Sequence, residues 1–419
     1  MLNEKFLHAV WKYALFNQEE LKTISNKKIE ILYCGEHNQN AGPDFLNAKI
    51  KVDDIIWCGN IEIHYKTSDF LKHQHHHDTN YSSLVLHVVY EHDKHIDNNC
   101  IETIVLKNYI PIHVLNQYHN LSTKKEQPAC TDYIDKISEF IINHWVQRMT
   151  IERLETKVNH IQDIFVKTKD YQETFYRLFC RHLGFKVNND LFEKLSENIS
   201  LNILLKNSYS LELTESLIYG CAGFLETEYT DRYLIHLQNE FSFLKKKYNI
   251  QTIQAHLWKF ARMRPANFPS VRLHQLALFI HYLQDMWHNP SLFFLERKNL
   301  EKLQMKPIGY FANHLTFEEE KTINKKYRFG QVAIQNILIN VVVPYLFFYG
   351  KSTGNDTYCD LALNYLESIK PEINSITKKF PHIKLINASQ SQGILQLFNF
   401  YCKEKRCAEC SIGIHLMKS

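Results

Sequence analysis

Two carboxylates in the stretch GPDFLNAKIKVDDIIWCGNIEIH, residues 42–64, occupy positions that paired strands would bring together. The runs 45–52 and 55–64 flank an Asp-Asp turn signal, so we expect two antiparallel strands joined by a short turn. Asp44 begins the first strand and Glu62 lies near the end of the second, so their side chains meet across the ladder at about 5 Å. Carboxylates at that distance repel each other unless a cation lies between them, and Mg²⁺ or Mn²⁺ prefers such oxygen ligands.

The residues that follow Glu62 could position water for a hydrolysis. Side chains alternate between the two faces of a strand, so Glu62, His64 and Lys66 share one face. A metal on the two acids can activate water and stabilise charge on a phosphodiester transition state, with His64 or Lys66 positioning that water. A neutral imidazole carries no fixed positive charge, which leaves a second interpretation open: a solvated hairpin face without a catalytic role.

The pattern Pro43-Asp44 followed by Glu62-Ile63-His64 resembles the motif of the PD-(D/E)XK nuclease superfamily. The resemblance implies that Asp44 and Glu62 bind the metal and that the residue two positions after the Glu, usually Lys, orients the attacking water. Here His64 occupies that position. The resemblance also implies a core in the order helix, three strands, helix, strand, and an additional acid on the first helix, for which Glu4 is the candidate.

The elements that must position these residues follow from hydrophobic periodicity. Apolar residues at helical spacing predict a first helix over 4–16. The expected strands are 28–35, 45–52, 55–64, 84–93 and 101–108. Together they predict an α+β N-terminal domain over 1–120, a mixed sheet with flanking helices that is restriction-endonuclease-like. The polar stretch 119–128 marks its end, and the mostly α-helical remainder is divided into a domain over 121–300 and a C-terminal region with a Cys cluster over 301–419.

Composition restricts the class of protein. The chain has 419 residues, of which 45% are hydrophobic, with only 12 Gly, so we expect a folded protein with sizeable cores. A net charge of +4 permits nucleic acid as a partner without requiring it. The most apolar run, 337–350, contains Asn340 and Pro344 and is short for a bilayer, so we expect a buried helix. The N-terminus lacks a signal-peptide layout, which predicts a cytoplasmic protein without a membrane partner.

Three cysteines near the end of the chain, Cys402, Cys407 and Cys410, have the spacing C-x4-C-x2-C. Three thiols this close in a reducing compartment indicate a metal. An iron–sulfur cluster would need a remote fourth ligand, for which Cys130 is the first candidate and Cys359 the second.

Alternatively, Zn²⁺ could take the three thiolates together with His415. Some PD-(D/E)XK nucleases resemble this layout of one Cys far from three clustered ones, which implies a structural staple here. A third interpretation is three reduced thiols at a helix end, and Lys405 and Arg406 between them could meet phosphate.

A His-rich stretch, SDFLKHQHHHD at 68–78, could also bind metal. On a helix His73 and His77 lie on one face, which suits Zn²⁺, but a polar, solvated turn is the favoured interpretation. Asp69 or His73 could instead flank the acid pair, and His87, in the middle of a strand, is expected to be a core histidine.

The segment RMRPANFPSVR contributes Arg262, Arg264 and Arg272, whose planar guanidinium groups suit phosphate. Contact with a nucleic-acid backbone is one hypothesis. The other is that these arginines cap helix ends and pair with acids inside the fold.

The chain also resembles an uncharacterised bacterial family of unknown function. The stretches that carry this resemblance are GPDFLNAKI, GNIEIHYKTSDF, RMRPANFPSVRLHQLA, VVPYLFFYG and YCKEKRCAECSIG. We therefore expect a magnesium-dependent nuclease acting on DNA or RNA. Two other classes stay open: a non-catalytic nucleic-acid-binding or scaffold protein on a degenerate nuclease fold, and a zinc-dependent hydrolase.

Overall fold

The computed structural model describes residues 2–73, 79–95, 101–317 and 327–419. The chain forms two compact units. The first, which we call the sheet unit, comprises Met1–Thr150, Glu372–Leu385 and Gln390–Ser419, and the second, the helical unit, comprises Ile151–Pro371 and Ile386–Ser389. This division does not coincide with the boundaries expected near 120 and 300, because the last part of the chain packs with the N-terminal segment.

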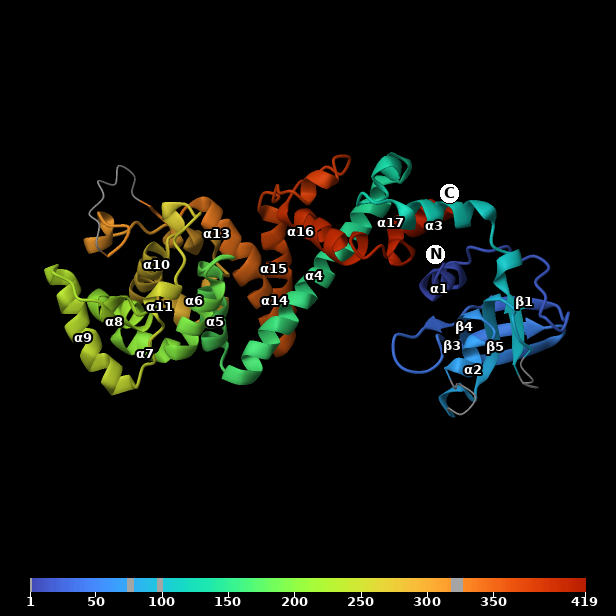
Figure 1. The fold of residues 1–419 in the computed structure, drawn as a ribbon, viewed down its shortest axis with the longest axis horizontal. Helices are drawn as coiled ribbons and strands as arrows, with labels where there is room; N and C mark the ends of the chain where they lie inside the picture. Colours follow the sequence, from blue (N-terminus) through green and yellow to red (C-terminus); the bar gives the residue numbers. More distant parts are fainter. Residues whose placement is uncertain (1, 74–78, 96–100, 318–326) are drawn as a thin grey trace. The chain divides into compact units, whose positions relative to one another are not determined.

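The sheet unit contains a mixed sheet, as predicted (Figure 1). Its strands lie in the order β1 (Ile29–Tyr33), β3 (Phe45–Val52), β4 (Ile55–Lys66), β5 (Leu84–Glu91) and β6 (Glu102–Val105), and the short β2 (Glu36–His37) also pairs with β3. The pairs β1–β3 and β3–β4 are antiparallel, whereas β4–β5 and β5–β6 are parallel. The expected α+β class is confirmed.

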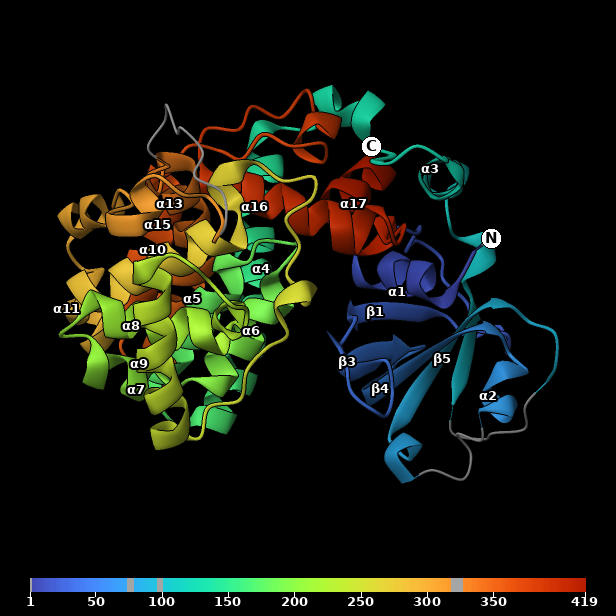
Figure 2. The ribbon, with the colours of Figure 1, turned by 60° about the vertical axis from the view of Figure 1, so that its left-hand side comes forward.

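Helix α1 (Glu4–Lys12) packs against β4 (Figure 2). The Asn3 side chain accepts a hydrogen bond from the Phe6 N–H and caps the helix, and its buried face includes Phe6 and Trp11. The helix ends at Lys12, earlier than the predicted 16, because the backbone turns through a left-handed conformation at Ala14 (φ 51°).

The other helices of the sheet unit are short, apart from α3. Those that lie wholly within it include α2 (Asp69–Lys72), α3 (Ile112–Thr123) and α17 (Ser411–Lys418). Helix α17 packs on α3 and on the turn Cys407–Glu409, and that turn also contacts α1. The C-terminal segment therefore completes the packing around the N-terminal helix.

The helical unit is built around one large apolar core. Helix α4 (Glu139–Thr168) leads into it from the sheet unit, and α16 (Ala388–Gln396) leads back out. Between them lie α5 (Tyr171–Leu183), α6 (Asn189–Asn198), α7 (Leu201–Asn207), α8 (Leu211–Cys221), α9 (Arg232–Tyr248), α10 (Pro269–Tyr282), α11 (Gln284–His288), α12 (Pro290–Phe293), α13 (Gln331–Ile337), α14 (Val343–Thr353) and α15 (Asp356–Ser368). The mostly helical remainder predicted from the sequence is confirmed.

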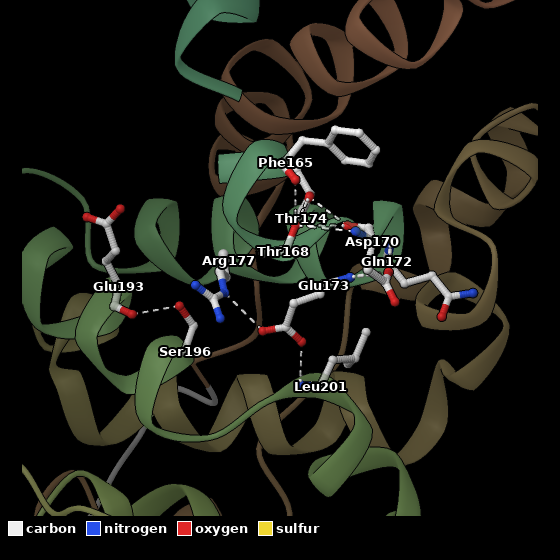
Figure 3. Close-up of polar contacts among 10 residues, drawn as sticks. All are labelled: Phe165, Thr168, Asp170, Gln172, Glu173, Thr174, Arg177, Glu193, Ser196 and Leu201. Atoms are coloured by element: carbon white, nitrogen blue, oxygen red, sulfur yellow. Dashed lines mark hydrogen bonds and ion pairs between the residues drawn. The ribbon is translucent and has the colours of Figure 1, made fainter. Parts of the chain in front are cut away.

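Polar side chains fix the start of α5 in this unit (Figure 3). Asp170 caps the helix by accepting hydrogen bonds from the backbone N–H groups of Gln172 and Glu173. The Glu173 carboxylate then accepts from Arg177 Nε at 3.0 Å and from the Leu201 N–H at 2.9 Å, which ties α5 to the start of α7.

The most apolar run of the chain lies in a continuous helix, Gln331–Thr353, whose middle is a π-helical segment, Leu338–Val342. Its 23 residues have the length and composition of a membrane span, but 67% of its most apolar window is buried inside the protein. Val341, Tyr345 and Leu346 are fully buried in the core of the helical unit. The predicted buried helix is confirmed.

Acid should destabilise the helical unit through His182. Burial lowers the pKa of this imidazole to about 4, although its Nδ1–H donates to the Leu178 carbonyl at 2.9 Å. Below its ordinary pKa of about 6.5 the unfolded chain binds a proton that the folded protein does not, so stability falls between about pH 6.5 and pH 4 by at most about 3 kcal/mol. Urea denaturation of wild type and His182→Gln across this range should show a weaker pH dependence in the variant, and identical dependences would contradict the prediction.

Candidate active site

The structure brings Asp44 and Glu62, hereafter the acid pair, into direct contact. The Asp44 backbone N–H donates to Glu62 Oε2 at 3.2 Å, and Asp44 Oδ2 accepts from the Ile63 N–H at 2.9 Å. Each acid is therefore held by the backbone of the other's strand.

A β-bulge in β3 creates this register. Near the turn Val52 pairs with Ile55 and Ala48 with Gly59, a register that would place Ile63 opposite Asp44 if it continued. The register instead shifts between Phe45 and Ala48, so that Phe45 pairs with Ile61 and the next position, Asp44, comes opposite Glu62. Asn47 adopts the left-handed conformation (φ 58°) within the bulge, and its N–H donates to Asn60 Oδ1 at 3.1 Å.

The loop before β3 is fixed by Asn38. Its N–H donates to the Asp44 carbonyl at 2.8 Å, and its side-chain Nδ2 donates to the Pro43 carbonyl at 3.0 Å. Its Oδ1 accepts from the Asn40 N–H at 2.9 Å. This Asx-type network sets the position of Asp44, and the sequence reasoning did not identify Asn38.

The pKa values of the two acids are shifted in opposite directions. Burial and the charge of Asp44 raise the pKa of Glu62, which is only 5% exposed, to about 9. Burial alone would raise the pKa of Asp44 as well, but His8 and the Ile63 N–H outweigh it and lower that pKa below its ordinary value. In the metal-free protein Asp44 is therefore ionised and Glu62 protonated at neutral pH.

Helix α1 contributes two further side chains. His8 Nε2 lies 3.4 Å from Asp44 Oδ2. Glu4 lies one turn earlier on α1, and its charge also raises the pKa of Glu62. The structure thus places the predicted Glu4 within electrostatic reach of the acid pair. His8 was missed by sequence reasoning, and its spacing of four residues from Glu4 was the signal that could have identified it.

A row of three histidines, hereafter the imidazole row, runs beside Glu62. His64 shares a face with Glu62, and its Nε2 lies 3.5 Å from Glu62 Oε1. His64 Nε2 also lies 3.2 Å from His73 Nδ1, and His64 Nδ1 lies 3.0 Å from His87 Nε2. His64 and His87 are buried whereas His73 is exposed, so the row connects the interior to the surface. His77, the expected zinc partner of His73, lies outside the described residues.

Lys66 occupies a different environment. Its backbone N–H donates to Asp69 Oδ2 at 3.0 Å, where the chain turns from β4 into α2, and Asp69 also pairs with Lys72. The Lys66 charge lowers the pKa of Asp93, after the hydrogen bonds from Ser68. These contacts place Lys66 beside α2 and Asp93, and no hydrogen bond or ion pair joins its side chain to the acid pair in the described part of the chain.

The two carboxylates of the acid pair suit Mg²⁺, which keeps several bound waters, better than a metal that is coordinated by protein side chains alone. Across the described residues, no group of three or more His, Cys, Asp or Glu side chains is arranged to hold a metal ion. Mg²⁺ binds through one or two carboxylates and keeps several waters, so two acids suffice for it. A structural zinc site, which needs four protein ligands, does not fit here.

The three predicted arginines lie in the helical unit in two different environments. Arg262 and Arg264 are exposed. Arg272 is 4% exposed, and its guanidinium lies between the rings of Phe185 and Phe329, at 4.8 and 4.9 Å from their centroids. The expected phosphate contact is therefore corrected for Arg272, because a guanidinium enclosed by two aromatic rings cannot reach a nucleic-acid backbone.

Four cysteines converge in the sheet unit: Cys130, Cys402, Cys407 and Cys410, which we call the cysteine pocket. They line one cavity, and none forms a disulfide. Burial and then the neighbouring Cys410 raise the pKa of both Cys130 and Cys407 to about 12, so the metal-free thiols stay protonated.

The structure separates the two expected candidates for the fourth ligand. Cys130 lines the cysteine pocket, whereas Cys359 lies in the helical unit, where its Sγ faces the Phe347 carbonyl at 3.7 Å. His415, the expected ligand in the zinc alternative, is not among the residues that line the cavity.

The chain belongs to the family described as "Protein of unknown function (DUF2851)", whose model matches residues 4–375. The expected membership of an uncharacterised family is confirmed. The match includes the acid pair and Cys130, whereas the other three pocket cysteines follow it. No curated protein and no solved structure matches the chain. The resemblance to PD-(D/E)XK nucleases stays a prediction.

The bulge should control the acid pair. Asn47→Gly retains the left-handed backbone, whereas Asn47→Val forces a β-branched residue into it, at a cost of about 1–3 kcal/mol. We expect Val to lower the melting temperature and to shift the backbone resonances of Asp44 and Glu62, with Gly close to wild type. Similar spectra for all three proteins would show that the bulge does not depend on this residue.

Removing the buried acid should stabilise the metal-free protein. Glu62→Gln keeps the acceptor for the Asp44 N–H but removes an ionisable group that is buried beside another, so unfolding in EDTA should cost on the order of 1 kcal/mol more. Mg²⁺ should raise the melting temperature of wild type but not of the variant.

Glu102→Gln is the matched control. Glu102 also lies on a strand of the sheet unit, but it pairs with Lys27 at 2.6 Å, and its substitution should destabilise the protein with or without Mg²⁺. Equal responses of both variants to Mg²⁺ would contradict a cation site at the acid pair.

Proposed function

We propose that the sheet unit is a magnesium-dependent phosphodiesterase that cleaves DNA or RNA. The observation that carries this proposal is the acid pair. Its two carboxylates come from neighbouring strands, Glu62 accepting from the Asp44 N–H and Asp44 from the Ile63 N–H, and burial and mutual repulsion oppose the ionisation of Glu62. Without a cation, this arrangement destabilises the folded protein. A destabilising pair of ionisable groups with shifted pKa values is typical of functional sites, which is the reason to infer function here.

Asp44 and Glu62 would hold the ion, with Mn²⁺ as the closest substitute. When bound, the ion activates water and neutralises charge that develops on the phosphodiester. His8 and the Ile63 N–H orient Asp44 from the side of its Oδ2, at 3.4 and 2.9 Å. Glu4 is available as a more distant acid in the same site.

His64 takes the place of the usual lysine in this proposal. Its imidazole can accept a proton from water beside Glu62, which a lysine ammonium cannot do. When the Nδ1–H of His64 donates to His87 Nε2 at 3.0 Å, its Nε2 carries the lone pair that accepts the proton, at 3.2 Å from Nδ1 of the exposed His73. Lys66 is not needed as a replacement, since it lies beside Asp69.

The order of elements supports the resemblance to the PD-(D/E)XK core. The chain runs through α1, β1, β3, β4, α2 and β5, which is the expected order of helix, three strands, helix and strand, apart from the two-residue β2. One difference is the helix between β4 and β5: α2 has only four residues and is too short to cover the sheet.

The exposed Arg262 and Arg264 are proposed to contact nucleic-acid phosphates.

A second candidate is a zinc-dependent hydrolase. The observation that favours it is the close approach of His64 Nε2 to His73 Nδ1, at 3.2 Å, with Glu62 Oε1 nearby. A non-catalytic nucleic-acid-binding or scaffold protein would keep the same fold without turnover.

Cleavage of labelled single- and double-stranded DNA and RNA tests the proposal. With Mg²⁺ or Mn²⁺, we expect wild type to cut and Asp44→Asn and Glu62→Gln to lose activity to background. His64→Ala should lose about 100-fold, the usual contribution of a general base. Lys66→Ala, on the same strand, should stay close to wild type.

The other candidates give different results in the same assay. Activity restored to EDTA-treated protein by Zn²⁺ and not Mg²⁺, and lost on His73→Ala, would identify the zinc enzyme. Nucleic-acid affinity that survives Glu62→Gln without cleavage of any substrate would identify the binding protein. Either result would overturn the magnesium-dependent nuclease.

A further inference from the structure

The sheet of the sheet unit has one face in the apolar core and one face that is partly open. Alternation along β3 sends Ala48, Ile50 and Val52 into the core that also contains the buried side chains of α1. Lys49 and Lys51 alternate with them and therefore point to the opposite face, hereafter the outer face.

The outer face also carries the acid pair. Ile61 and Ile63 of β4 lie in the apolar core, so Glu62 between them points to the outer face. Cys58 lies on the same face by the same alternation, and it pairs in register with Lys49 of β3. The acid pair and the two lysines of β3 therefore share one continuous surface.

The two ends of the outer face differ in what covers them. At the end of the imidazole row, the Phe70 ring of α2 lies over the sheet, with its centroid 6.2 Å from that of His64 and 5.1 Å from that of His87. Toward the β3–β4 turn, Lys49 and Cys58 are both exposed. This arrangement leaves an open path along β3 and β4 from the turn to the acid pair.

The charge along this path is most positive at Lys49. Within the described ranges Lys49 forms no ion pair, whereas Lys51 Nζ lies 3.9 Å from Asp54 Oδ1 and is paired in register with Glu30. Tyr33 of β1 lies opposite Lys49 and is 46% exposed, so an accessible aromatic ring accompanies the free ammonium group. A basic surface with aromatic rings beside it is typical of proteins that bind single-stranded nucleic acid.

The spacing of the lysines suits a chain of phosphates rather than one compact anion. Cys58 lies four residues before Glu62, so its partner Lys49 is about 13 Å from the acid pair at about 3.3 Å per residue. Lys51 lies about 7 Å farther along the same face. An extended single strand presents phosphates at intervals of this order, about twice the 3.4 Å rise per phosphate of a duplex strand.

We propose that the outer face binds a single strand of DNA or RNA that runs along β3 and β4 to the acid pair. Lys49 binds a backbone phosphate about two nucleotides from the bond at the acid pair, and Tyr33 stacks on a base beside it. Lys51 makes a weaker contact farther along the strand. This inference rests on the proposed function, because it assigns the substrate class of the acid pair as single-stranded.

Binding of short labelled single strands of DNA and RNA, and of the matching duplexes, tests the proposal by fluorescence anisotropy in EDTA, where no strand is cut. We expect single strands to bind more tightly than duplexes. Lys49→Ala should lower the slope of log affinity against log salt by about 0.7, the value for one phosphate contact on a single strand. Tyr33→Ala should weaken binding about tenfold, and Lys51→Ala should have a smaller effect than Lys49→Ala.

Lys107→Ala is the matched control. Lys107 is also an exposed lysine of the sheet unit, but its Nζ lies 5.6 Å from the ring centroid of Tyr90, which belongs to the apolar core on the other side of the sheet. This substitution should leave both the affinity and its salt dependence unchanged.

Cys58 provides a readout that depends neither on cleavage nor on a substitution. Its exposed thiol lies opposite Lys49, so a bound single strand should slow its alkylation by iodoacetamide severalfold, as followed by mass spectrometry. No protection by single strands, equal protection by duplexes, or an unchanged salt slope in Lys49→Ala would overturn the proposal.

The same measurements separate this inference from the nuclease activity on which it rests. Cleavage that requires Asp44 and Glu62, without protection of Cys58, would overturn the single-strand face and leave the nuclease intact. Protection of Cys58 with Lys49-dependent binding, but without cleavage of any substrate, would support the single-strand face and identify the non-catalytic binding protein instead.

Discussion

The close approach of Asp44 and Glu62 is the constraint around which the sheet unit is organised. Two acids with little access to water must be held by donors, and each is held by a backbone N–H at or next to the other acid. This exchange needs the bulge at Asn47, the Asn38 loop and the placement of α1 that brings His8 to Asp44. The strained bulge in β3 therefore places Asp44 opposite Glu62, which regular strand pairing would not do.

Much of the sheet could be predicted from the sequence because strands have a simple period. Alternation correctly placed Glu62 and His64 on one face, and the turn signal correctly joined β3 to β4. The contact between the acids was expected for an incomplete reason, since the turn register alone would have put Ile63 opposite Asp44. The bulge requires Asn47 to adopt a left-handed backbone conformation. The residues around Asn47 follow an ordinary strand pattern, so the sequence does not predict this conformation.

What could not be predicted depends on contacts between distant residues. His8 lies 36 residues before Asp44. Its spacing from Glu4 places both on one face of α1, but the packing of α1 on β4 is needed to show the contact with Asp44. Arg272 looked available for phosphate, but Phe185 and Phe329, far away in the sequence, enclose it. The spacing of Cys402, Cys407 and Cys410 indicated a metal, whereas the choice of Cys130 over Cys359 required the tertiary structure. Lys66 is the last residue of β4, at the point where the chain turns into α2.

The sheet unit is discontinuous in the sequence, since residues 151–371 separate its first 150 residues from its last segments. On the ribosome, the N-terminal sheet emerges long before α17, so its second apolar core stays incomplete while the whole helical unit is synthesised. The helical unit is nearly continuous in sequence and can fold first. Cys130 has no neighbouring pocket cysteine until the segment that contains Cys402, Cys407 and Cys410 has been synthesised. A product truncated before residue 402 would lack three of the pocket cysteines and helix α17, and it would expose apolar surface to cellular proteases.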